Sequence, residues 1–187
     1  MKTKKISAAN VASRPGKKAV ASKRNPETSV IELAPVRFHI QKILVPVDFS
    51  ENSQKALRYA RPFAEQFGAS LTLLHVMEPI NYPIEYGYAP IAPLEAEETR
   101  QGELLARLKQ LGTELGATVP VKSIVRVGRA WKEIVDFAKA QNTDLVIVAT
   151  HGYTGLKHAL LGSVAEKVVR HAPCPALVVR TEEHDFL

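Results

Sequence analysis

The chain has 187 residues, of which 45% are hydrophobic and 24% charged, a composition typical of one globular domain with its own core. No apolar run approaches the roughly 20 residues that a membrane-spanning helix needs, and the first residues lack the apolar segment of a secretory signal. The single cysteine, Cys174, cannot form an internal disulfide, and nothing in the sequence supports a cysteine zinc site. We therefore expect a cytoplasmic protein without membrane contact.

The net charge of +6 is concentrated near the N-terminus. Residues 1–37 hold nine Lys or Arg and two Glu, whereas the remaining 150 residues hold 16 basic and 17 acidic side chains. Residues 1–36 lack apolar periodicity, so we predict a disordered basic extension there, followed by a folded domain at 37–187. The favoured role of the extension is that of a solubilising leader. A weak contact with nucleic acid and an organelle transit peptide are less favoured alternatives.

The first strand and helix are expected at 42–47 and 51–67. Lys42 to Val47 is a short apolar run, and Asp48-Phe49-Ser50 turns out of it. Ser50 is a suitable N-cap and Gly68 a suitable C-terminal stop. Pro62 removes one backbone hydrogen bond and is expected to kink the helix. The apolar residues recur at helical spacing on one face: Ala56, Leu57, Ala60, Phe63, Ala64 and Phe67.

The middle of the chain continues the alternation of strands and helices. Residues 70–76 predict a second strand, and the Pro- and Tyr-rich segment 78–93 is unusually long for a loop, which suggests a lid or a contact surface. A long helix follows, with Gly116 closing it and a stripe formed by Leu104, Leu108, Leu111 and Leu115. Residues 119–127 alternate between apolar and other side chains, which is typical of a half-exposed edge strand.

The last third predicts two further helix–strand units. The third helix is marked by an apolar stripe at Trp131, Ile134, Val135 and Ala138. Residues 144–149 consist of Asp144 and a fully apolar run, as a central parallel strand requires. A glycine-bearing loop leads to a last helix that Pro173 stops, and 176–179 predicts the fifth strand. Strands alternating with helices predict an α/β domain with a doubly wound parallel sheet and helices on both faces.

Two loops are candidates for a ligand site, because doubly wound sheets bind ligands beyond the carboxyl ends of their strands. The first contains Asp48, which is suited to accept a hydrogen bond from a ribose or adenine, or to help hold a divalent metal through phosphate oxygens. The second runs from Ala149 to Ser163. Gly152 permits close backbone approach, and Gly162 and Ser163 precede a helix whose free N–H groups favour an anion such as phosphate. Taken singly, each signal is weak, because glycines after a strand more often form turns than phosphate sites, and a turn-and-cap role alone also explains Asp48.

Three segments together resemble the universal stress protein family over residues 40–181. They are Ile43 to Ser50, Leu74 to Val76, and above all Asp144 to Arg180 with its Thr-His-Gly-Tyr-Thr-Gly and Leu-Leu-Gly-Ser-Val-Ala-Glu sequences. The resemblance implies a single five-stranded sheet of order 3-2-1-4-5, Rossmann-like and similar to the adenine nucleotide α-hydrolases. It also implies a stress-response module that binds adenine nucleotide.

ATP-binding members of that family carry the pattern Gly-x-x-Gly-x9-Gly-Ser/Thr. Gly152, Gly162 and Ser163 match its larger part, but Ala149 stands in the place of the first glycine. Since alanine adds only one methyl group, we expect reduced tolerance for ligand and not its loss. The residues that the resemblance assigns to ATP are Pro46, Val47, Asp48, Val76, Val148, Ala149, Gly152, Gly162, Ser163 and Val164. Mg²⁺ bound through the phosphates, or AMP or another adenylate in place of ATP, stays open.

Other reactive side chains receive structural interpretations. The six histidines have no spacing typical of a metal site, and His75 and His151 are expected to be structural even though both end strands on the ligand side. Cys174 and Trp131 are expected to be packing residues, and Arg129 a solvated one. No Walker-type Gly-Lys-Ser/Thr sequence occurs, so we expect at most a weak ATPase and no catalytic residue.

The fifth strand, 176–180, is expected at an edge of the sheet and is apolar and uncharged. Pairing with the same strand of a second copy would cover it, so we predict a homodimer, as the resemblance also implies. The alternatives to an ATP-binding regulatory module are a nucleotide-independent interaction protein of the same fold and a slow ATP hydrolase.

Overall fold

The computed structural model describes residues 38–79, 94–116, 118–150 and 161–180. The predicted extension at 1–36, residues 80–93 of the long loop, and Gly152 lie outside these residues. Strands and helices alternate along the chain, as the sequence predicts. In chain order they are β1 (Lys42–Pro46), α1 (Glu51–Phe67), β2 (Ser70–Met77), α2 (Leu94–Glu114), β3 (Val121–Val127), α3 (Ala130–Ala140), β4 (Leu145–Ala149), α4 (Ser163–His171) and β5 (Ala176–Val179).

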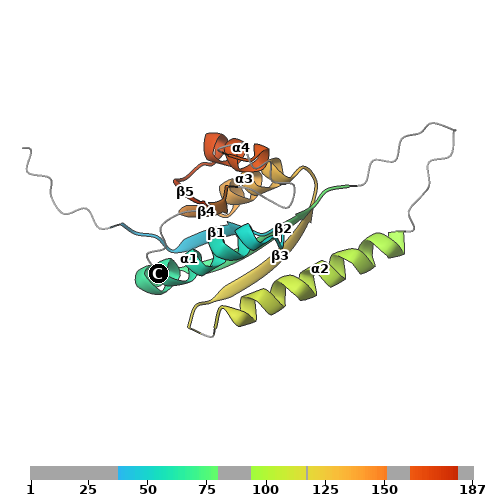
Figure 1. Cartoon of the computed structure of the whole chain (residues 1–187), viewed down its shortest axis with the longest axis horizontal. Coiled ribbons are helices and arrows are strands. Elements are labelled where there is room, and N and C mark those ends of the chain that lie inside the picture. The colour runs from blue at the N-terminus through green and yellow to red at the C-terminus, as the bar shows by residue number, and fades with distance from the viewer. Residues whose placement is uncertain (1–37, 80–93, 117, 151–160, 181–187) are drawn as a thin grey trace, which may run out of the picture. The chain divides into compact units, whose positions relative to one another are not determined.

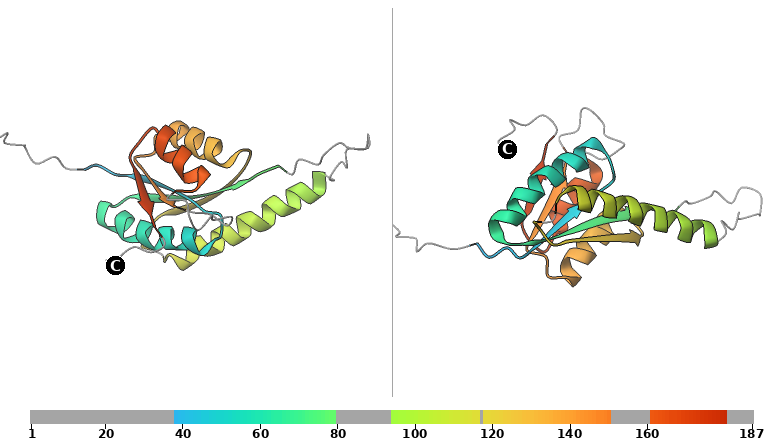
Figure 2. Two further views of the ribbon diagram at one scale, coloured as in Figure 1. Left: turned by 45° about the horizontal axis from the view of Figure 1, so that its top comes forward. Right: turned by 90° about the horizontal axis from the view of Figure 1, so that it is seen from below.

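The strands form one parallel sheet of order β3-β2-β1-β4-β5 (Figure 1), which confirms the predicted topology. Helices α1 and α2 cover one face, and α3 and α4 cover the other (Figure 2). The chain first winds from β1 outward to β3 and then returns to the opposite side of β1 to add β4 and β5. The order of the strands therefore reverses between β1 and β4.

The core is split by the sheet into two apolar clusters. Because successive strand residues point to opposite faces, Ile43 and Val45 pack beneath α1, whereas Leu44 packs with α3 and α4. Every residue of β4 is buried, which explains why its sequence is continuously apolar. Among the residues that the structure describes, no helix combines the length and apolarity needed to cross a membrane.

Helix α1 has the termini that the sequence predicts. The Ser50 hydroxyl accepts a hydrogen bond from the Ser53 N–H at 3.2 Å, and Gly68 ends the helix with φ of 64°, a conformation in which its missing Cβ avoids strain. The helix runs unbroken through Pro62 as far as Phe67. Its contacts explain this continuity, since Tyr59, Ala60 and Ala64 on both sides of the proline are buried.

Helix α2 packs through its C-terminal half. Leu108 is fully buried, and a Cβ at Gly112 would lie 3.1 Å from the Val121 side chain, so the helix approaches β3 closely there. Residues 96–100 are exposed, and this end of the helix extends past the sheet (Figure 1). Strand β3 occupies an edge, as predicted, but begins at Val121 and not at 119.

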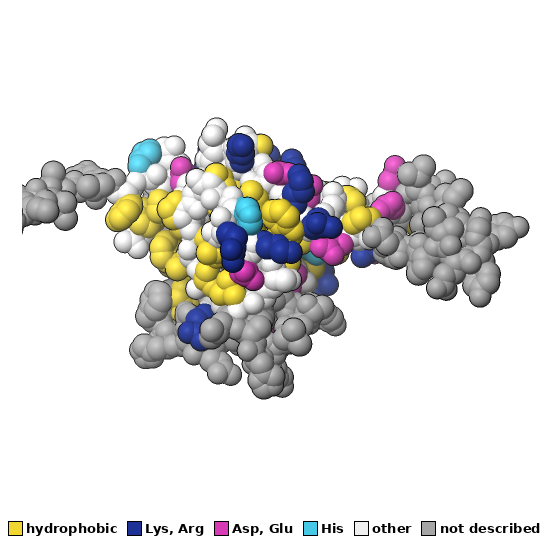
Figure 3. Space-filling model, turned by 90° about the horizontal axis from the view of Figure 1, so that it is seen from above, with side chains coloured by type: hydrophobic (Ala, Val, Ile, Leu, Met, Phe, Trp, Pro, Cys, Tyr) yellow, Lys and Arg dark blue, Asp and Glu magenta, His cyan; other side chains and the backbone are white. Residues whose placement is uncertain are grey.

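The outer surface of α3 and α4 carries interspersed charges of both signs (Figure 3). Lys132 pairs with Asp136 at 2.6 Å, and Arg170 pairs with Glu166 at 2.7 Å, each one helical turn apart. Such exposed pairs contribute little to stability. This mixed surface agrees with the near-neutral charge of residues 38–187.

Candidate functional site

The candidate site lies at the carboxyl edge of the sheet, where β1 and β4 are neighbours. Parallel pairing of Ile43 with Leu145 and of Leu44 with Val146 sets their register, so both strands end at the same edge. The loops that follow Pro46 and Ala149 therefore leave the sheet side by side, at the point where the strand order reverses. Ligands of doubly wound folds bind at such a reversal.

Hydrogen bonds within the loop hold the segment after β1. The Asp48 carboxylate accepts from the Ser50 N–H at 3.0 Å and from the Ser50 hydroxyl at 2.5 Å. Ser50 in turn caps α1 through Ser53. The predicted turn-and-cap role of Asp48 is therefore present, and it positions the carboxylate at the carboxyl edge of the sheet.

Two rings and a guanidinium group surround the same loop. The His75 ring nitrogen Nδ1 lies 2.7 Å from the Val47 carbonyl oxygen, so Nδ1 carries the proton and donates it. The Phe49 ring packs against His75 with centroids 4.8 Å apart, and the Arg107 guanidinium carbon lies 4.3 Å from the Phe49 centroid. His75 thus has the structural role predicted for it, whereas the sequence does not point to Phe49 or Arg107.

Backbone hydrogen bonds pin the two ends of the second loop together. The Thr150 N–H donates to the Val179 carbonyl at 3.0 Å, and the Gly162 N–H donates to the Thr150 carbonyl at 2.7 Å. Helix α4 begins directly after Gly162, whose carbonyl accepts the Glu166 N–H at 2.9 Å. The N-terminus of α4 is therefore held against the end of β4. Thr150 is buried and was not among the predicted site residues.

The described members of the predicted site fall on three neighbouring strands and one helix start. Pro46 ends β1 and is followed by Val47 and Asp48, Val76 lies near the end of β2, and Val148 and Ala149 end β4. Gly162, Ser163 and Val164 form the start of α4, which the bond from Gly162 to Thr150 joins to β4. Their roles toward a ligand stay predictions, as does that of Gly152, which lies outside the described residues.

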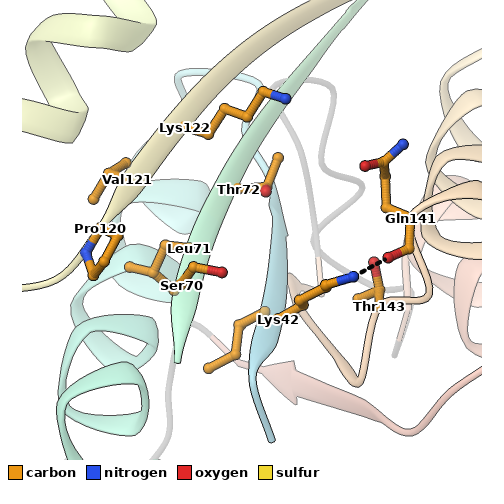
Figure 4. A pocket seen from close by; sticks show the side chains of 10 residues that line it. Lys42, Ser70, Leu71, Thr72, Pro120, Val121, Lys122, Gln141 and Thr143 are labelled. Carbon is orange, nitrogen blue, oxygen red and sulfur yellow. Dashed lines mark hydrogen bonds between the residues drawn. The ribbon is translucent and has the colours of Figure 1, made fainter. Parts of the chain in front are cut away.

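A groove of about 280 Å³ opens at the opposite, amino edge of the sheet (Figure 4). The starts of β1, β2 and β3 line it together with Gln141 and Thr143, which follow α3. The Lys42 ammonium group donates to the Gln141 carbonyl at 2.9 Å within it. Because this groove lies at the amino ends of the strands, it is not part of the predicted site.

Metal-ligating and thiol chemistry find little support in the described residues. Among them, no group of three or more His, Cys, Asp or Glu side chains gathers to hold a metal ion. Burial, aided by the charge of Asp144, raises the pKa of the Cys174 thiol, which therefore stays protonated near neutral pH. Trp131 packs at the edge of the α3–α4 cluster, as predicted, with its ring 5.4 Å from that of His171.

The sequence matches the model of the Universal stress protein family over residues 39–180. It is 35% identical over 143 residues to the universal stress protein MJ0531 of Methanocaldococcus jannaschii, covering 75% of this chain and 82% of that one. It is 33% identical to the universal stress protein YxiE of Bacillus subtilis, covering 74% of this chain and 98% of that one.

Solved structures agree with the sequence comparison. The structure of MJ0577 superposes with a TM-score of 0.67 at 32% identity, covering 79% of this chain and all of that one. The universal stress protein UspA from Lactobacillus plantarum gives a TM-score of 0.63 at 27% identity, covering 77% and 100%. A universal stress protein in complex with cAMP shares the fold, with a TM-score of 0.58 at 22% identity over 78% of this chain and 100% of that one.

Proposed function

The chain belongs to the universal stress protein family, and from this premise we propose that it is a stress-response module that binds an adenine nucleotide at the carboxyl edge between β1 and β4. The observation that carries the proposal is the hydrogen bond from Gly162 to Thr150, which joins the start of α4 to the end of β4. Beside it, β1 ends in the loop that carries Asp48. One site would thus combine backbone donors for phosphate with a carboxylate for the nucleoside.

Each proposed contact follows from the chemistry of the group that makes it. The first N–H groups of α4, at Ser163 and Val164, carry partial positive charge and suit phosphate oxygens. Pro46, Val47 and Asp48 would meet the adenosine, with Val76 beside the adenine. Val148, Ala149 and Gly152 would lie along the ribose and phosphates. The described part of this set shares one edge of the sheet.

ATP is the adenylate that the glycine pattern favours, with Mg²⁺ bound through its phosphates. The buried Ala149, in place of the pattern's first glycine, is expected to weaken the site by crowding and not to abolish it. A chain of the same fold has been solved with cAMP, so AMP-like ligands belong in the same test. A cytoplasmic location stays a prediction from the sequence.

Titration calorimetry of the full chain with Mg-ATP, AMP and cAMP tests the proposal. The wild type is expected to bind, and Gly152→Val to lose tenfold or more in affinity, because a branched side chain would occupy the space of the phosphates. The matched control is Gly102→Val, at an exposed position of α2 where an added Cβ meets no atom within 4 Å. This control is expected to bind as the wild type does.

Other outcomes identify the alternatives. No heat and no thermal shift at millimolar ligand would contradict nucleotide binding and favour an interaction protein of the same fold. Unchanged affinity in Gly152→Val would show that the second loop is not the site. Sustained phosphate release that Asp48→Ala abolishes would instead favour a slow ATP hydrolase.

We also propose that two copies pair through the free edge of β5. The carbonyls of Pro175 and Val179 accept hydrogen bonds from β4, so the alternate residues Ala176 and Val178 direct their backbone groups to the outer edge. This edge is apolar, and a second copy of β5 would satisfy its outward N–H and C=O groups.

Val178→Pro removes an outward donor and spares the ladder to β4, so it is expected to convert a dimer to a monomer in size-exclusion chromatography with light scattering. Val127→Pro makes the matched change near the end of the other edge strand, β3, and is expected to leave the mass unchanged. A monomeric wild type at micromolar concentration would contradict this proposal without affecting that of nucleotide binding.

A further inference from the structure

Phe49 adopts a backbone conformation that its side chain disfavours. Its φ is 66°, in the left-handed region, which is unfavourable for a residue with a Cβ. Asn142 is the other non-glycine residue of the described chain with positive φ, and asparagine tolerates this region well. Phenylalanine does not, so contacts of its side chain must hold Phe49 in place.

Those contacts come from two different elements. His75, on β2, stacks against the Phe49 ring at 4.8 Å and donates to the Val47 carbonyl at 2.7 Å. Arg107, on α2, places its guanidinium carbon 4.3 Å from the centroid of the same ring. We call Phe49, His75 and Arg107 the Phe49 clamp. The clamp fixes the ring, and with it the backbone between Asp48 and Ser50.

The Arg107 contact is the adjustable part of the clamp. His75 lies within a strand of the sheet, whereas Arg107 is an exposed residue of α2, one position before the fully buried Leu108. The exposed end of α2 extends beyond the sheet (Figure 2). A shift of α2 would therefore change the contact between Arg107 and Phe49.

We propose that Arg107 is a positioning residue for the adenine nucleotide, acting through Phe49 on the loop that carries Asp48. This inference rests on the proposed function, in which the nucleotide binds beside the Asp48 loop. It adds that α2 helps to orient this loop. It makes nucleotide binding and the docking of α2 reciprocal: each strengthens the other by the same factor.

The size of the effect follows from the contact. A cation over an aromatic ring at an exposed site is worth about 0.5–1 kcal/mol, which limits the loss in affinity for Arg107→Ala to about two- to fivefold. Arg107→Lys keeps a cation near the ring and is expected to retain most of the affinity. Arg100→Ala, two turns earlier on the same face of α2, is the matched control and is expected to change nothing.

A comparison of ligands separates positioning from direct contact with phosphate. If Arg107 acts through the Asp48 loop, Arg107→Ala weakens adenosine, AMP and ATP by the same factor. If it attracts the phosphates directly, the loss grows from adenosine to ATP, and the inference is overturned. In a Phe49→Leu background, Arg107→Ala is expected to have no further effect, because the ring through which it acts is gone.

Calorimetry of the full-length protein well below its melting temperature provides these affinities. At such a temperature the variants are folded, so a loss of stability alone would leave the affinities unchanged. Equal binding by the wild type and Arg107→Ala would overturn the inference alone. A wild type that binds none of the three ligands would overturn the proposed function as well. Amide exchange gives the reciprocal test: saturating ATP is expected to slow exchange in α2, and unchanged exchange would contradict the coupling.

Discussion

Helices α1 and α4 both begin at the carboxyl edge of the sheet, but their N-termini are built differently. At α1, Ser50 caps the Ser53 N–H, the Ser53 hydroxyl donates to the Ser50 carbonyl, and Asp48 holds Ser50. At α4 the N-cap is Gly162, which has no side chain to offer, and its own N–H is used to bind Thr150.

The difference separates a start capped by its own side chains from one whose N-cap residue makes no side-chain hydrogen bond to the helix. A serine or aspartate cap stabilises a helix by only a few tenths of a kcal/mol relative to glycine, so Gly162 gives up a small amount of helix stability. We interpret this as the cost of keeping the N–H groups of Ser163 and Val164 accessible to phosphate. The predictions that follow alter one start or the other.

The largest expected effect is on ATP affinity and comes from placing a charged N-cap residue at the start of α4. Gly162 has φ of −70° and ψ of 154°, a backbone conformation that aspartate adopts readily. Gly162→Asp is expected to stabilise the free protein by a few tenths of a kcal/mol, measured by urea unfolding. Its carboxylate would repel the phosphates and lower the affinity for Mg-ATP tenfold or more, about 1.4 kcal/mol, measured by calorimetry.

Gly162→Asn distinguishes the effect of the negative charge from the effect of the cap. It adds a comparable cap without a negative charge, so its loss of ATP affinity is expected to be clearly smaller than that of aspartate. Equal affinity in the wild type and Gly162→Asp would show that the start of α4 does not face the phosphates.

The next largest effect is on stability and comes from replacing the serine at each helix start with alanine. Ser50→Ala removes the cap of α1 and a hydroxyl that donates to Asp48, and is expected to lower the free energy of unfolding by about 1 kcal/mol. Ser163→Ala replaces an exposed residue within the first turn of α4. It is expected to change the free energy of unfolding by less than about 0.5 kcal/mol. Urea unfolding of both variants without nucleotide measures the difference, and equal losses would contradict the distinction between the two starts.

The two helix starts also show which features of the fold the sequence predicts. The cap of α1 is local, since Ser50 and Gly68 flank an apolar stripe of helical period, and the structure confirms both ends. The order of the sheet came from resemblance to a family and is also confirmed. The beginning of α2 at Leu94 was not predicted, because residues 96–100 are exposed and give no apolar period.

Contacts between distant residues left no signal in the sequence. Phe49 and Arg107 are far apart along the chain, and neither the left-handed conformation of a phenylalanine nor its clamp follows a local pattern. Strand β3 begins later than its alternation suggests because Pro120 has no N–H for a ladder, although Val119 is buried as the alternation implies. Local periods thus reveal elements and caps, whereas the environment of the site needs the fold.

The smallest expected effect concerns the other end of α4 and depends on pH. Burial raises the pKa of the Cys174 thiol above its ordinary value of 9.0, with a further contribution from the charge of Asp144. As the pH rises past that ordinary value, the unfolded chain loses the thiol proton first, so the folded state binds more protons and the free energy of unfolding falls. Cys174→Ala removes this dependence. Urea unfolding from pH 7 to 10 should therefore show a steeper alkaline decline for the wild type than for Cys174→Ala, and parallel curves would mean that the thiol is as accessible to water when folded as when unfolded.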